Sequence, residues 1–158
     1  MAKILHIFRA PKKRLPMEEM EEGRVIRDRG LDGCAHARPG SGRQVLLVDR
    51  ETLEAMDLTP GMIRENITTD GINVNSLVVG QELCIGEARL QVSMVCHPCD
   101  QMEKIRPGLR RELYGRRGML CRVLKGGVIR RGDAIERMRG EEAMSSTQNS
   151  GSGGIFSE

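Results

Sequence analysis

Short apolar runs, separated by glycine, recur along most of the chain. Lys3–Phe8, Val45–Val48 and Ala88–Val95 are dominated by apolar and β-branched residues, so each predicts a β-strand. The dipeptides Gly86-Glu87 and Gly126-Gly127 separate such runs and predict hairpin turns. Further short strands are predicted at residues 67–69, 82–85, 119–124, 128–130 and 134–138. Many short strands with glycine at the corners predict a mainly β fold that closes into a barrel, with a few short helices.

A few segments have a helical pattern instead. Asp49 precedes a Glu-rich first turn, and apolar residues recur at Leu53 and Met56, so a helix capped by Asp49 is predicted there. Pro107-Gly108 divides two further short helical segments. The predicted helices cover residues 50–56, 99–105 and 109–114.

The chain has the size and composition of a single domain. Residues 1–138 have the mixed character that buries one core, whereas 139–158 are rich in Gly, Ser and Glu and are expected to be a disordered tail. The N-terminus lacks the features of a signal peptide, and no apolar segment approaches membrane-spanning length. With five cysteines, an odd number, reduced thiols in the cytoplasm are expected, with no membrane partner.

Charge and aromatic content narrow the classes of ligand. The 25 Lys and Arg and 22 Asp and Glu residues leave a net charge of +3, which favours a compact anionic ligand over duplex nucleic acid. Two Phe, one Tyr and no Trp argue against a surface that stacks single-stranded bases. No nucleic-acid partner is therefore expected.

The tetrapeptide Cys96-His97-Pro98-Cys99 carries the strongest sign of chemistry. It follows an apolar strand and precedes a predicted helix, where backbone N–H groups favour the thiolate that attacks sulfur or binds metal. Three alternatives remain at this point. Both cysteines could be small buried hydrophobes, a C-x-x-C dithiol redox pair, or part of a zinc site, although no second paired spacing supports zinc.

A series of motifs between residues 3 and 138 extends this signal over nearly all of the predicted domain. The motifs are Gly30–His36, Arg43–Val45, Pro60–Gly71, Leu77–Gly80, Ile85-Gly86, Pro98-Cys99, Arg122–Gly127 and Gly132-Asp133. In this order and spacing the chain resembles the MOSC (molybdenum cofactor sulfurase C-terminal) domain family, in its small stand-alone bacterial form. The resemblance implies a compact β-barrel with a working cysteine.

The resemblance assigns the central role to Cys99. This thiol would carry a persulfide or would bind the molybdenum of the molybdenum cofactor (molybdopterin), and Cys96 is the second candidate for that role. The family usually has Asp where this chain has Cys34, so any role of that carboxylate is in doubt. The resemblance also implies that Cys34 itself lies near the expected site.

Five further residues are candidates for holding the cofactor. Arg43 and Arg64 would bind its phosphate through forked hydrogen bonds, unless they are solvated or paired surface charges. Glu65 and Asn66 would contact the pterin or tie down the loop, and His36 would orient a ligand or serve as a structural histidine.

These assignments lead to several hypotheses of function. The leading one is binding or sulfuration of the molybdenum cofactor, with the domain acting as a sulfur carrier, a cofactor carrier or a sulfur transferase. Its partners would be the cofactor or a precursor, a sulfur donor, and an apo-molybdoenzyme as acceptor. One alternative is a component of a molybdenum-dependent reductase of N-hydroxylated compounds, and the other is a dithiol redox protein.

Overall fold

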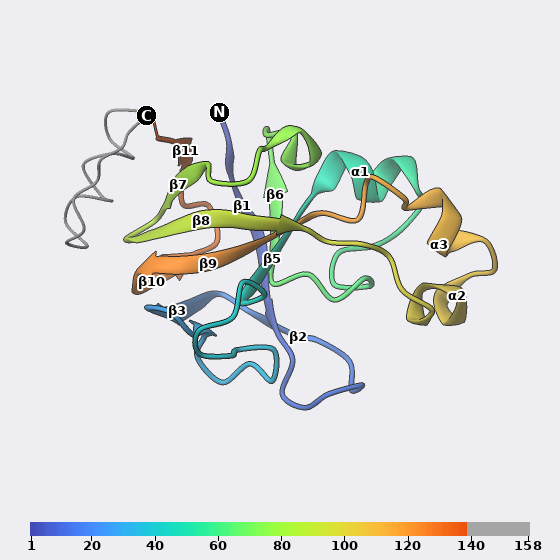
Figure 1. Ribbon diagram of the computed structural model, residues 1–158, viewed down its shortest axis with the longest axis horizontal. Coiled ribbons are helices and arrows are strands. Elements are labelled where there is room, and N and C mark those ends of the chain that lie inside the picture. Colours follow the sequence, from blue (N-terminus) through green and yellow to red (C-terminus); the bar gives the residue numbers. More distant parts are fainter. Residues whose placement is uncertain (139–158) are drawn as a thin grey trace.

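Two β-sheets and three short α-helices make up the computed structural model, which describes residues 1–138 (Figure 1). The expectation of a disordered tail at 139–158 lies outside these residues. The strands are β1 (Lys3–Arg9), β2 (Glu18–Met20), β3 (Glu22–Ile26), β4 (Gly30–Leu31), β5 (Val45–Asp49), β6 (Ile67–Asp70), β7 (Glu82–Ile85), β8 (Ala88–Val95), β9 (Met119–Lys125), β10 (Gly127–Arg130) and β11 (Ile135–Arg137). The helices are α1 (Arg50–Ala55), α2 (Gln101–Ile105) and α3 (Leu109–Glu112), with one 3-10 turn at Val74–Ser76.

The prediction of a mainly β fold is confirmed, but that of a closed barrel is wrong. The larger sheet has the order β11-β7-β8-β9-β5-β6-β1-β2, and the smaller one has the order β10-β3-β4. Between β1 and the segment entering β11 there is one isolated bridge, from Lys3 to Ala134, with a few backbone hydrogen bonds around it and no strand ladder. Strand β11 is three residues long and pairs with β7, and it remains an end strand of the larger sheet, which therefore does not close.

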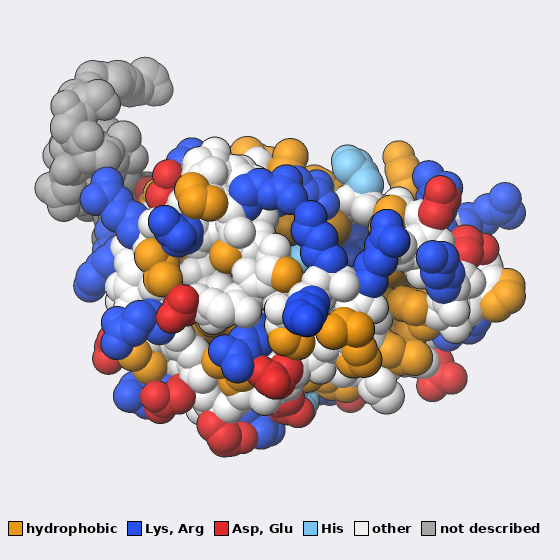
Figure 2. Space-filling model, turned by 90° about the horizontal axis from the view of Figure 1, so that it is seen from below, with side chains coloured by type: hydrophobic (Ala, Val, Ile, Leu, Met, Phe, Trp, Pro, Cys, Tyr) orange, Lys and Arg blue, Asp and Glu red, His pale blue; other side chains and the backbone are white. Residues whose placement is uncertain are grey.

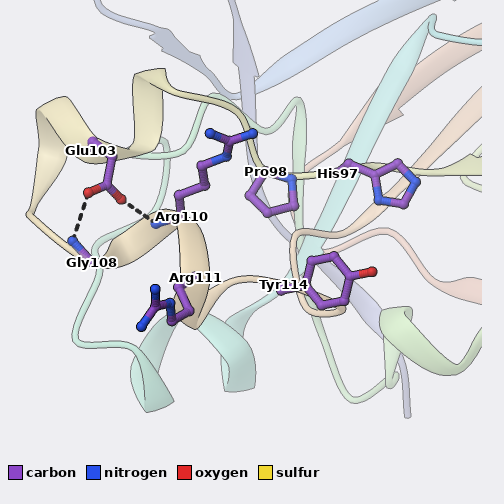
Figure 3. A pocket seen from close by; sticks show the side chains of 7 residues that line it. All are labelled: His97, Pro98, Glu103, Gly108, Arg110, Arg111 and Tyr114. Carbon is purple, nitrogen blue, oxygen red and sulfur yellow. Dashed lines mark hydrogen bonds between the residues drawn. The ribbon is translucent and has the colours of Figure 1, made fainter.

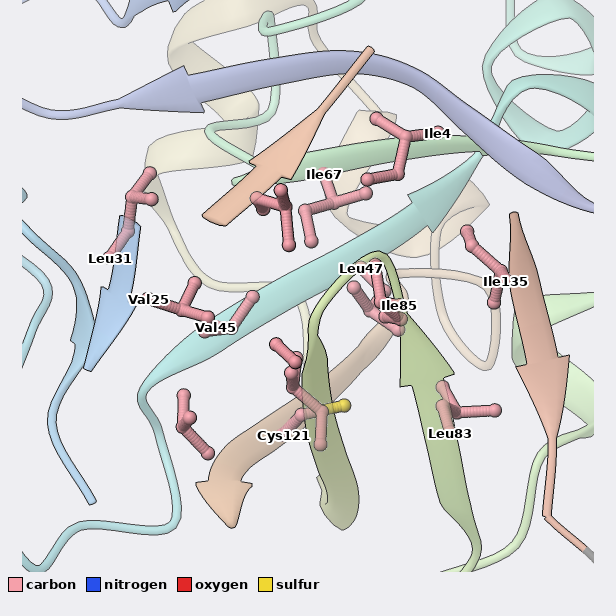
Figure 4. Close-up of a cluster of buried hydrophobic side chains, with 14 of the residues drawn as sticks. Ile4, Val25, Leu31, Val45, Leu47, Ile67, Leu83, Ile85, Cys121 and Ile135 are labelled. Atoms are coloured by element: carbon pink, nitrogen blue, oxygen red, sulfur yellow. The ribbon is translucent and has the colours of Figure 1, made fainter. Parts of the chain in front are cut away.

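Strand β5 lies between two hydrophobic cores because both of its faces are buried. Val45 and Leu47 pack into one core, and Leu46 and Val48 pack into the other, which includes side chains of all three helices. Helix α1 connects β5 to β6, and these two strands are parallel, whereas the other strand pairs are antiparallel. Figure 4 shows the first core, where side chains from several strands converge. The continuously apolar sequence of β5 thus matches its two covered faces.

The smaller sheet corrects two details of the sequence analysis. Charged residues on its outer face hid β3, in which Gly23 and Val25 are buried and Glu22 and Arg24 are exposed. Gly126-Gly127 is not a hairpin turn, because β10 leaves β9 and pairs with β3. A Cβ at Gly126 would lie 2.7 Å from the Val25 carbonyl oxygen, so glycine permits this crossing between the sheets.

The helical end of the molecule is reached through the four residues that carry the C-x-x-C pattern. Strand β8 ends at Val95 and α2 begins at Gln101, while α2 and α3 lie together away from the sheets (Figure 1). Asp49 stands at the N-cap of α1 as predicted, but its side chain makes no capping hydrogen bond there, and burial raises its pKa. The segment 96–99 therefore connects the sheet to the helices.

Candidate functional site

Cys99 lies in the lining of a pocket of about 270 Å³, which we call the thiol pocket. Loops that precede or follow β1, β4, β5, β6, β8 and β9 meet there, so residues far apart in sequence become neighbours. The pocket is lined by Lys13, Ala35, His36, Arg38, Arg43, Gln44, Leu46, Arg64, Asn66, Cys96, Cys99, Gln101, Arg117 and Leu120. Six of the seven predicted site residues are among them, and Glu65 is the exception.

The two cysteines of the C-x-x-C segment differ in exposure. Cys96 is 5% exposed and packs in the second hydrophobic core, whereas Cys99 is exposed, and both are free thiols. The Cys96 N–H donates to the Gly118 carbonyl at 3.0 Å, and the Cys99 carbonyl accepts from the Met102 N–H at 3.0 Å. The segment is therefore fixed at both ends, with Cys99 as its accessible sulfur.

Glu65 holds the loop that presents Arg64. Glu65 is fully buried, and its Oε2 accepts hydrogen bonds from the Gly61 N–H and the Thr68 hydroxyl, each at 2.8 Å. Arg64 has a φ of 66°, a left-handed conformation that is unfavourable for a residue with a side chain. Of the two roles considered for Glu65, the structure thus shows the tie within the loop.

The amide of Asn66 is committed to the protein although the residue lines the thiol pocket. Its Oδ1 accepts from the Leu46 N–H at 2.9 Å, and its Nδ2 donates to the Phe8 carbonyl at 3.2 Å and to Cys34 Sγ at 3.4 Å. These bonds join β5, the end of β1 and the glycine-rich loop. Asn66 therefore helps to shape the wall of the pocket, and both N–H groups of its amide are used within the protein.

Cys34 lies behind the wall formed by Asn66 and His36. Burial raises the pKa of its thiol, but hydrogen bonds from the His36 side chain and the Ala10 N–H outweigh burial and bring the pKa down to about 7. The Ala10 N–H lies 3.3 Å from the sulfur. Cys34 thus sits among hydrogen-bond donors that suit an anion.

Sequence reasoning missed three cationic residues of the lining, Lys13, Arg38 and Arg117. The first two stand in loops that look like solvated chain. Arg117 follows Arg116, and such a pair of arginines is typical of a surface, yet Arg117 is only 6% exposed. Its Nε and Nη1 atoms have no hydrogen-bond partner in residues 1–138. No sequence signal separates the buried arginine from its exposed neighbour.

The charge of the thiol pocket is of one sign. Five of its residues are Lys or Arg, and none of the described residues in its lining is Asp or Glu. Figure 2 shows Lys and Arg side chains around the middle of one face of the molecule, whereas many of the acidic side chains on that face lie toward its lower edge. Unbalanced positive charge in a concave site attracts a compact anion.

A second depression, which we call the helical hollow, lies beside the same segment. It has a volume of about 630 Å³ and is lined by His97, Pro98, Glu103, Gly108, Arg110, Arg111 and Tyr114 (Figure 3). The Glu103 carboxylate accepts hydrogen bonds from the Gly108 and Arg110 N–H groups, both at 2.9 Å, which lower its pKa. Arg110 forms an ion pair with Asp100 at 2.5 Å.

Comparison with protein families identifies the domain. The model of the MOSC domain matches residues 36–136, which is more than half of the chain. The chain belongs to the MOSC domain family. MOSC domains are associated with the molybdenum cofactor, and the resemblance found in the sequence is confirmed.

Solved structures show that this MOSC fold recurs among bacterial proteins. The YUAD protein from Bacillus subtilis has a TM-score of 0.70 and 21% sequence identity, over 85% of this chain and 93% of that chain. YiiM from Geobacillus stearothermophilus has a TM-score of 0.73 and 20% identity, over 88% and 76% of the two chains. YiiM from Escherichia coli has a TM-score of 0.63 and 20% identity, over 85% and 69%. None of the curated proteins matches the sequence.

Residues 1–138 of this MOSC domain contain neither a membrane-spanning helix nor a preformed cluster of metal ligands. No helix within residues 1–138 is long and apolar enough to cross a membrane. In the same residues, no group of three or more His, Cys, Asp and Glu side chains is arranged to hold a metal ion.

Proposed function

We propose that this MOSC domain binds the molybdenum cofactor, or a precursor of it, in the thiol pocket, with the Cys99 sulfur as the point of attachment. The observation that supports this most directly is the composition of the lining. An exposed thiol shares a pocket of about 270 Å³ with five Lys or Arg residues and with no Asp or Glu of the described chain.

The donor groups of the pocket fit the chemistry of this cofactor. The cofactor joins a metal centre, which a soft thiolate suits, to a phosphorylated pterin, which cationic side chains suit. Cys99 would bind the metal, and Arg43 and Arg64 would contact the phosphate. His36 would border the ring system, while Asn66 and Glu65 would keep the surrounding loops in place. When bound, the cofactor supplies a metal centre for transfer of sulfur or oxygen.

Sulfur transfer through the same cysteine is a second candidate, favoured by the exposure of Cys99 to an approaching protein. In this step the Cys99 thiolate attacks the outer sulfur of a persulfide on a donor protein. A new S–S bond forms to Cys99, the S–S bond of the donor breaks, and the donor cysteine leaves as a thiolate. The domain would then pass this sulfur to the cofactor or deliver the loaded cofactor to an apo-molybdoenzyme.

The test uses the full chain produced in a host that makes the cofactor. Wild type, Cys99→Ser and the control Cys84→Ser, whose cysteine lies outside the thiol pocket, are analysed for molybdenum, for released pterin and for added sulfur by intact mass. We expect wild type and Cys84→Ser to carry metal and pterin, or an added sulfur atom. Cys99→Ser should lose the metal and the added sulfur, because serine lacks a soft and readily ionised ligand atom.

Other outcomes would redirect the assignment. If Cys99→Ser retains metal, pterin and sulfur at wild-type levels, the proposal is wrong and Cys96 becomes the residue to replace. A reversible disulfide between Cys96 and Cys99, with both essential for activity, would favour the dithiol redox alternative. Reduction of N-hydroxylated compounds by the loaded protein would support the reductase alternative over a simple carrier.

A further inference from the structure

The guanidinium of Arg117 is buried without a counter-ion. The residue is 6% exposed, and its Nε and Nη1 atoms have no hydrogen-bond partner within the described chain. Buried charges in proteins are normally paired, because the protein interior solvates them less well than water does. An unpaired guanidinium in this position needs an explanation.

Arg50 shows how the same chain treats an arginine that has no role in a pocket. Its Nε and Nη2 donate to Asp70 at 2.9 and 2.6 Å, and its Nη1 donates to Glu54 at 2.9 Å. Arg50 is more exposed than Arg117 and therefore needs this compensation less. With Glu51 at 3.5 Å, the chain supplies three carboxylates to the arginine that water already reaches, and no ion pair to Arg117 is present in residues 1–138.

The backbone fixes Arg117 beside the thiol segment. The next residue, Gly118, has a φ of 111°, and a Cβ there would collide with the Leu47 carbonyl oxygen, so only glycine allows the chain to approach β5 this closely. The Gly118 carbonyl accepts the hydrogen bond from the Cys96 N–H. One backbone contact thus holds together the residues that carry the buried cation and the C-x-x-C segment.

Arg64 repeats the pattern on another wall of the thiol pocket. Its Nη1 donates to the Leu15 carbonyl at 2.6 Å, but its buried Nη2 has no partner in residues 1–138. Its left-handed backbone is kept in place by the Glu65 bonds described above. Two guanidinium groups that line one pocket therefore both have buried nitrogen atoms without a hydrogen-bond partner in residues 1–138.

We propose that Arg117 and Arg64 form an anchoring subsite for a terminal phosphate group, whose dianion is the counter-charge that the protein itself does not provide. Arg117 is then the specificity-determining residue of the pocket, and the empty form of the domain is destabilised by its unpaired charge. The inference rests on the proposed function for the identity of the pocket but does not depend on the chemistry of Cys99.

The choice of phosphate follows from the groups that face the ligand. Guanidinium groups bind phosphate oxygens with two parallel N–H···O bonds, and two such groups match a terminal phosphate better than a singly charged carboxylate. A volume of about 270 Å³ suits a compact ligand of this kind. The ligand class is thus a small molecule that ends in a phosphate monoester.

Inorganic phosphate is the probe, with acetate as the singly charged comparison, both titrated calorimetrically at constant ionic strength into the full chain. Arg117→Met removes the charge and keeps an apolar side chain, Arg117→Lys keeps the charge without the fork, and Arg116→Gln alters the exposed neighbour. We expect Arg117→Met to weaken phosphate binding by at least about tenfold, because a charge-assisted hydrogen-bonding group is lost. Its melting temperature without phosphate should rise, because a buried unpaired charge is removed.

Each result bears on the inference in one direction. Arg117→Lys should bind phosphate more weakly than wild type and more tightly than Arg117→Met, and Arg116→Gln should match wild type in both measurements. The inference is overturned if Arg117→Met keeps wild-type phosphate affinity, if it melts at a lower temperature than wild type without phosphate, or if acetate binds as tightly as phosphate. Phosphate binding by Cys99→Ser at wild-type strength separates this subsite from the proposed function.

Discussion

The two depressions beside the C-x-x-C segment differ in the charge of their linings as well as in volume. The helical hollow, lined by His97 and Pro98, is more than twice as large as the thiol pocket, lined by Cys96 and Cys99. In the hollow a carboxylate is present, and Arg110 has an acidic partner. In the thiol pocket the cations have no acidic neighbour in the described lining.

This contrast indicates which depression is built for chemistry. A hollow whose charges are already balanced gains little from an anionic ligand, whereas a pocket with surplus cations and an accessible thiol gains both charge compensation and a reactive atom. Room for a ligand is therefore the weaker criterion here. The unbalanced charge is the stronger one, and it can be tested by changing it.

The largest change in phosphate affinity should follow from placing a carboxylate in the lining of the thiol pocket, like that of Glu103 in the helical hollow. Arg64→Glu places a negative charge in the lining, so phosphate binding should weaken by about a hundredfold, because attraction is replaced by repulsion. Arg111→Glu makes the same change in the helical hollow and should leave phosphate affinity near that of wild type. Calorimetric titration at constant ionic strength measures both, and equal losses would show that the two depressions do not differ as argued.

The cysteines outside both depressions give a second, smaller contrast. Cys121 on β9 is fully buried in the first core, and burial raises its pKa to about 12, whereas Cys84 on β7 is partly exposed beside the Met138 sulfur. Cys121→Ser buries a hydroxyl among apolar groups and should lower the free energy of unfolding by about 1–3 kcal/mol. Cys84→Ser should cost less than about 1 kcal/mol.

Urea denaturation measures both changes, and phosphate titration serves as the control. Because neither cysteine lines the thiol pocket, both variants should bind phosphate as wild type does. A Cys121→Ser protein of unchanged stability with impaired binding would mean that this sulfur takes part in the site.

The strands differ in how well the sequence alone predicts them. The predicted bounds of strand β8 agree with the structure, because its apolar run begins directly after the Gly86-Glu87 turn. Strand β3 was missed, since its alternate residues carry charges on the outer face. Closure of the barrel depends on pairing between strands at the two ends of the domain. A local sequence pattern does not show whether such distant strands pair.

The site followed from motifs, but its electrostatics did not. The motifs pointed to Cys99 and Arg64, which line one pocket, and to Glu65, which does not line it and whose carboxylate binds Gly61 and Thr68. Arg117 carries no motif, and whether an arginine is solvated or buried depends on the contacts of the whole fold. The residue types were therefore predictable, whereas the missing counter-charges required the structure.

The smallest predicted effect concerns Cys34, the anion-like group behind the thiol pocket. Its pKa falls from 9.0 to about 7 in the folded protein, so between these two values the unfolded chain holds a proton that the folded protein has released. Stability from this group is therefore gained as pH rises from about 7 to about 9, and it is lost as pH falls through about 7. We expect a gain of about 1 kcal/mol across this range, after allowance for solvent screening.

Two substitutions isolate this contribution, each followed by urea denaturation between pH 6 and 9. Cys34→Ser keeps an acceptor for the Ala10 and Asn66 donors but does not ionise, so the rise with pH should disappear. Cys34→Asp places a carboxylate at this position, and because an aspartate is ionised throughout this range in both states, the free energy of unfolding of this variant should also be independent of pH. If Cys34→Ser retains the full wild-type rise, the thiol is not the group responsible, and the donors around its sulfur do not favour the thiolate.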